Sequence, residues 1–69
     1  MPKRYLSEDI IRVLKKNGFV FASQKGSHIK LFSVSSKAVV IVPANRKTVP
    51  AGTFASILRQ SNLTKEDFI

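Results

Sequence analysis

Residues 19–42, FVFASQKGSHIKLFSVSSKAVVIV, decide the fold of this 69-residue chain. Aromatic and β-branched side chains gather in three runs, at 19–23, 27–32 and 37–42, with short polar breaks between them. Such runs are typical of strands, and short polar breaks are typical of hairpin connections. Pro43 lacks a backbone N–H and ends the third run. The segment therefore predicts a three-stranded antiparallel meander.

An amphipathic helix is predicted before the meander, over residues 8–17. Ser7 is expected to cap this helix, and Gly18 is expected to follow its last residue. On a helical wheel the apolar side chains form one arc, made of Leu6, Ile10, Ile11, Val13 and Leu14. The opposite face carries the cations Arg12, Lys15 and Lys16. The apolar arc is therefore expected to face the core.

A second helix is predicted after the meander, with Thr48 as its cap and Pro50 in its first turn. Its buried stripe is expected to consist of Ala51, Phe54, Ala55, Ile57 and Leu58. The sequence 64–67 reads as a capping box that starts one more turn, carrying Phe68 and Ile69. Two helical stripes and one sheet predict a single two-layer α+β domain over residues 1–69, in the order α-β-β-β-α.

The composition excludes several classes of protein. With no Cys and one His, the chain offers neither a disulfide framework nor the usual ligands of a zinc site. A domain of this size has no room for a separate cofactor-binding unit, so we expect neither cofactor nor metal. The longest apolar run, 38–42, is far below the roughly 20 residues of a membrane span, and no apolar signal segment follows Met1. We therefore expect a cytoplasmic protein.

The charge of the chain is unevenly distributed. Twelve Lys and Arg face four Asp and Glu, which gives a formal net charge of +8. Ten of the twelve cations fall in residues 1–47, whereas residues 48–69 are balanced. A one-sided positive field attracts polyanions, and nucleic acid is the commonest large polyanion in a cytoplasm. The charge therefore favours RNA or DNA as the partner over a merely solvated surface.

His28 is the candidate catalytic residue. Strand alternation places His28 and Lys30 on one face of the second strand, with Phe32, and places Ile29 and Leu31 on the face toward the helices. A neutral imidazole can act as a general base. RNA carries its own nucleophile, the 2′-hydroxyl, so its cleavage needs only a base, cations around the phosphate and a proton donor.

Other interpretations compete with this one. A lone strand histidine is often a surface contact without a catalytic role. Phe19, Phe21 and Phe32 could stack bases on an open sheet, although alternating Phe in a small domain is more often core. The adjacent carboxylates Glu8 and Asp9, and likewise 66–67, fit helix first turns better than an acid/base pair.

Several motifs, taken in order, resemble the HicA toxin family over nearly the whole chain. They are Asn17-Gly18-Phe19, Gln24-Lys25-Gly26-Ser27-His28, Val40-Ile41-Val42-Pro43, Gly52-Thr53-Phe54 with Ile57-Leu58, and Glu66-Asp67-Phe68. The resemblance implies a fold like the double-stranded RNA-binding domain, an mRNA-cleaving activity and inhibition by a HicB antitoxin. It also implies that His28 is catalytic. Members often carry a second His after the Val-Pro, where this chain has Asn45, which cannot shuttle protons.

We therefore predict a small, metal-independent ribonuclease toxin with His28 as general base. Its candidate phosphate contacts are Lys25, Lys30, Arg46 and Lys47, and Gly26 and Ser27 shape the turn. The sequence does not identify the proton donor, for which Tyr5 and the lysines are candidates. A non-catalytic RNA-binding module would use the same basic surface, and a third interpretation is a domain that docks an acidic protein.

Overall fold

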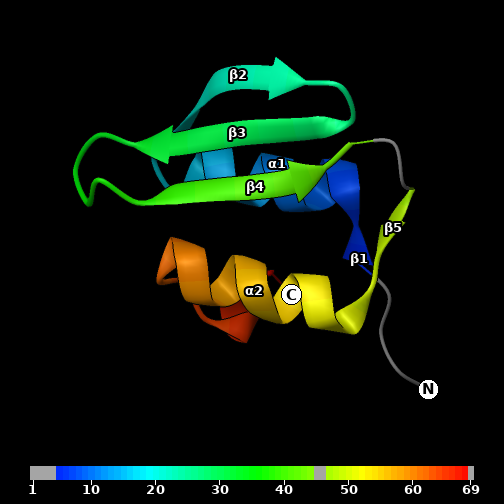
Figure 1. Cartoon of the computed structure of the whole chain (residues 1–69). Coiled ribbons are helices and arrows are strands. Elements are labelled where there is room, and N and C mark those ends of the chain that lie inside the picture. Colours follow the sequence, from blue (N-terminus) through cyan, green and yellow to red (C-terminus); the bar gives the residue numbers. More distant parts are fainter. Residues whose placement is uncertain (1–4, 45–46, 69) are drawn as a thin grey trace.

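The protein is a three-stranded antiparallel sheet with two α-helices packed on it (Figure 1). The computed structural model describes residues 5–44 and 47–68. The elements, in chain order, are β1 (Tyr5–Leu6), α1 (Ser7–Lys16), β2 (Phe19–Lys25), β3 (His28–Ser33), β4 (Val39–Pro43), β5 (Thr48–Val49), α2 (Ala51–Ser61) and the 3₁₀ turn η1 (Lys65–Phe68). This arrangement confirms the predicted α+β fold and is consistent with the fold of the double-stranded RNA-binding domain.

The sheet has the predicted order β2-β3-β4. Gly26 adopts a positive φ of 59° in the turn between β2 and β3, a conformation that suits glycine. A bulge between Phe21 and Ser23 shifts the register of β2 on β3. The last hairpin is longer than predicted, because the chain turns as far as Lys37, which has a φ of 63°, and β4 begins only at Val39.

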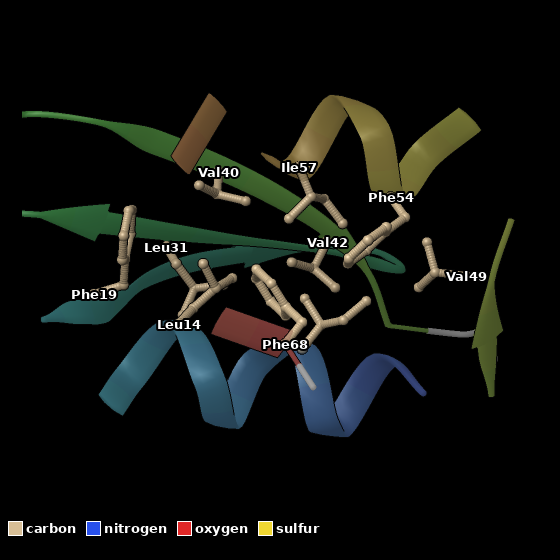
Figure 2. Close-up of a cluster of buried hydrophobic side chains, with 10 residues drawn as sticks. Leu14, Phe19, Leu31, Val40, Val42, Val49, Phe54, Ile57 and Phe68 are labelled. Carbon is tan, nitrogen blue, oxygen red and sulfur yellow. The ribbon is translucent and has the colours of Figure 1, made fainter. Parts of the chain in front are cut away.

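The core lies between the sheet and the helices (Figure 2). Leu31, Val40 and Val42 project from the sheet, and α1 contributes Ile10 and Leu14, all fully buried. The remaining buried apolar side chains are Phe19, Val49, Phe54, Ile57 and Phe68. The ring of Phe54 in α2 contacts both β1 and η1. It stacks on the Tyr5 ring with a centroid distance of 3.9 Å and meets the Phe68 ring edge-on with a centroid distance of 5.2 Å. The predicted core face of the first helix is thereby confirmed.

The prediction that Ser7 caps the first helix is wrong. Leu6 holds the N-cap position, and the helix runs one residue ahead of the predicted range. Ser7 is the first helical residue and is buried; its hydroxyl donates to the Pro43 carbonyl at 3.1 Å, and its N–H donates to the Lys47 carbonyl at 3.0 Å. The serine is therefore used to join the start of α1 to the end of β4.

Thr48 does not cap α2 either. Thr48 and Val49 form β5, which pairs antiparallel with β1, and Pro50 is the N-cap of a helix that begins at Ala51. The pairing of two distant segments overrides the local capping signal. The buried face of α2 also differs from the predicted one. Phe54, Ile57 and Ser61 are buried, whereas Ala51 and Ala55 are exposed.

The capping box before η1 is confirmed. The Asp67 carboxylate accepts hydrogen bonds from the Thr64 N–H at 2.8 Å and from the Thr64 hydroxyl at 3.1 Å. These bonds hold the short turn that buries Phe68 against the core. Ile69 lies outside the described residues.

Candidate active site

His28 stands at the first position of β3, directly after the turn 26–27, and its side chain is exposed. The turn is held on both sides. The Gln24 side-chain amide donates to the Gly26 carbonyl at 3.1 Å, and the Ala44 N–H donates to the Ser27 carbonyl. The backbone that presents the imidazole is therefore bonded to β2 and to the residue that follows β4.

The cations nearest to His28 in the sheet register are Lys25 and Lys30. Lys25, His28 and Pro43 form one cross-strand row, and Ser23, Lys30 and Ile41 form the next. Both rows face away from the core, as the predicted alternation requires, since His28 and Lys30 are exposed whereas Leu31 is buried and Ile29 is half-buried. A hollow of about 480 Å³, here called the outer hollow, is lined by Ser23, Lys25, His28, Lys30 and Ile41.

A second hollow borders His28 on the side of α2. This helix hollow of about 370 Å³ is lined by His28, Ile41, Pro43, Pro50, Thr53, Ser56 and Gln60. Its wall is fixed by a bond from the Ile41 N–H, on the free edge of β4, to the Gln60 side-chain oxygen at 3.2 Å. The imidazole therefore lies where two hollows of different chemistry meet.

Comparison with protein-family models matches residues 7–63 to the family described as HicA toxin of bacterial toxin-antitoxin. The chain belongs to the HicA toxin family. It is thus the toxin component of a toxin-antitoxin pair, and the predicted family membership is confirmed. A search of curated proteins gives no significant match.

The structure of this HicA toxin separates the residues predicted to contact phosphate. Lys25 and Lys30 lie together in the outer hollow. Lys47 is exposed in the connection between β4 and β5, and its carbonyl is bonded to α1. Arg46 and Asn45, in the same connection, lie outside the described residues.

Tyr5 is not brought to His28. Its ring stacks on Phe54, and it lines a different hollow, beside Val49 and Leu58. Since neither hollow that borders His28 includes Tyr5, the lysines are the better candidates for the proton donor.

The three phenylalanines do not form one stacking platform. Phe19 is 3% exposed and belongs to the core. Phe21 lies opposite Leu31 and Phe32 lies opposite Val20, so the two side chains are on different faces of the sheet. Phe21 is nevertheless 53% exposed, at the edge strand.

No Asp or Glu of the described residues lines either hollow that borders His28. Glu8 and Asp9 occupy the first turn of α1, where Asp9 pairs with Arg12, and Asp67 caps η1. Within residues 5–44 and 47–68 there is no group of three or more His, Asp or Glu side chains able to hold a metal ion. No helix in that part of the chain is long and apolar enough to cross a membrane.

Sequence reasoning missed the contribution of α2. Thr53, Ser56 and Gln60 share one helix face because they are spaced three and four residues apart. The spacing of these polar residues can be seen in the sequence. Their position beside His28 cannot, because it depends on α2 lying along the free edge of β4.

Proposed function

We propose that this toxin is a ribonuclease that cleaves mRNA, with His28 as the general base. The supporting observation is the position of His28: an exposed imidazole at the junction of two hollows, one of them lined by Lys25 and Lys30. Membership of a toxin family agrees with a chemistry that damages the cell.

The proposed reaction uses the 2′-hydroxyl of the RNA. The neutral imidazole of His28 removes the hydroxyl proton as the oxygen attacks the adjacent phosphorus. The phosphorus bond to the 5′ oxygen breaks, and that oxygen takes a proton from a lysine ammonium or water. The products are a 2′,3′-cyclic phosphate and a 5′-hydroxyl end.

Lys25 and Lys30 stabilise the charge that builds up on the phosphate oxygens in the transition state. Gly26 and Ser27 contribute by shaping the turn that presents His28. Lys47, and Arg46 next to it in the sequence, extend the basic surface along which the RNA backbone would lie.

The test is incubation of the purified protein with a structured mRNA, with and without EDTA. The His28→Ala variant should retain its fold and its affinity for RNA, because an exposed imidazole contributes little packing. Its cleavage rate should fall by about a hundred- to ten-thousand-fold. Lys65→Ala is the matched control and should cleave normally, because Lys65 lies in the charge-balanced region and lines neither hollow beside His28.

Equal cleavage by wild type and His28→Ala would reject the general base. RNA retention without any fragments would instead favour the non-catalytic RNA-binding module. Loss of activity in EDTA, restored by a divalent ion, would overturn the proposed metal independence.

The partner that we propose is a HicB-type antitoxin that covers the His28 face. Part of this contact should be electrostatic, because Lys25 and Lys30 lie beside His28, so reversing either charge should slow association. Competition between antitoxin and an uncleaved RNA for the His28→Ala protein tests the geometry. Simultaneous binding with no mutual loss of affinity would exclude steric blocking.

A further inference from the structure

The two hollows that meet at His28 differ in charge. The outer hollow carries Lys25 and Lys30 and suits a phosphate. In the helix hollow, His28 is the one titratable side chain among the described lining residues, and the other polar groups are neutral. A hollow without fixed charge is poorly suited to a phosphate and better suited to an uncharged part of a nucleotide.

The size and walls of the helix hollow fit a nucleobase. Its volume of about 370 Å³ is within the range of small-ligand pockets. Pro43 and Pro50 supply apolar walls against which a flat ring can pack. A base lodged here would belong to a nucleotide next to the phosphate held over His28.

Gln60 has one end of its amide already occupied. Its oxygen accepts the Ile41 N–H at 3.2 Å, and a donor such as this N–H requires the oxygen, not the nitrogen, to face it. The Nε2 group, which only donates, is therefore the end left for a ligand. Ser56 is less available, because its hydroxyl donates to the Gly52 carbonyl and accepts from Arg59.

We propose that the helix hollow binds one RNA base beside the cleavage site, and that Gln60 selects a base with a carbonyl group at C4 of a pyrimidine or C6 of a purine. A donor recognises the O4 of uracil or the O6 of guanine. It is mismatched with the exocyclic amino group that cytosine or adenine carries at the equivalent position. This specificity role rests on the proposed function, but its test does not require cleavage.

The experiment compares the affinities of two uncleavable RNAs, 2′-O-methyl hexamers of uridine and of cytidine, by titration at low salt. The wild type should bind the uridine hexamer several-fold to tenfold more tightly, as one hydrogen bond provides. Gln60→Glu keeps an oxygen for the Ile41 N–H but replaces the donor with an acceptor. This variant should reverse the preference in favour of cytidine.

Asn62→Asp is the matched control, because it makes the same chemical change two residues away at a position that does not line the hollow. It should weaken both hexamers equally and keep the uridine preference. Equal affinities in the wild type, or an unchanged ratio in Gln60→Glu, would overturn the proposal.

Cleavage of a random-sequence RNA pool separates the two proposals. If the wild type cuts, one position beside the cut should be enriched in uracil and guanine, and Gln60→Glu should shift it toward cytosine and adenine. If the wild type does not cut but the hexamer preferences hold, ribonuclease activity is rejected and base selection by Gln60 stands.

Discussion

Ser7 links the first helix to the strand that pairs with the candidate catalytic residue. Its buried hydroxyl donates to the carbonyl of Pro43, and Pro43 lies opposite His28 in the sheet. A single hydrogen bond between residues 36 apart in the sequence therefore supports the backbone behind the site.

Replacing Ser7 with Ala should lower the free energy of unfolding by about 1–2 kcal/mol, because the part-buried carbonyl of Pro43 loses this donor. Chemical denaturation of wild type and variant measures the difference. Ser23→Ala, an exposed serine on β2, is the control and should change stability by less than about 0.5 kcal/mol. A Ser7→Ala variant as stable as the control would show that the bond contributes nothing.

At the scale of the elements, the β3–β4 connection contains a strained residue. Lys37 adopts a φ of 63° while its N–H donates to the Ser33 carbonyl at 2.8 Å. A residue with a Cβ is disfavoured in this left-handed conformation, whereas glycine adopts it readily.

Lys37→Gly should therefore be more stable than Lys37→Ala by about 1 kcal/mol, since both remove the same charge and only the alanine keeps the strain. Thermal unfolding of the two variants measures the difference. If the alanine variant unfolds at the same or a higher temperature, the left-handed conformation is not populated in solution.

The elements themselves were largely predictable, but the starts of the helices were not. Hydrophobic periodicity predicted both helices and all three strands of the sheet, because burial of one face depends on local spacing. Ser7 and Thr48 are residues that often cap helices, but each makes a long-range contact instead. Ser7 bonds to Pro43, and Thr48 belongs to the β1–β5 pair. No local pattern shows that residues 5–6 will meet residues 48–49.

At the scale of the whole molecule, the positive field should govern association with RNA. If the protein neutralises about four phosphates, the logarithm of the binding constant should fall with the logarithm of salt concentration with a slope near −3. Lys25→Glu should flatten this slope, and Lys65→Glu, in the balanced region, should change it little. Filter binding across a salt series gives both slopes; equal effects of the two reversals would show that the charge asymmetry is irrelevant.

The candidate site was predictable in part. Strand alternation predicts that His28 and Lys30 share the outer face, and Lys25 is close to them in the sequence. The catalytic role of His28 comes from the family resemblance. The helix hollow requires α2 to lie along the edge of β4, and that position depends on the Gln60 bond to Ile41 and on packing of Phe54 and Ile57. Neighbours of this kind cannot be obtained from periodicity.

The late position of part of the core also constrains when folding can be completed during synthesis. Of the ten buried apolar residues in the described part of the chain, four follow β4, namely Val49, Phe54, Ile57 and Phe68. A nascent chain that has been translated only through Pro43 already contains His28 and its lysines, but it lacks these four side chains and the wall that α2 supplies. Such a small domain cannot fold with so incomplete a core. A chain that ends at Pro43 should therefore remain unfolded and should lack any function that depends on the folded domain.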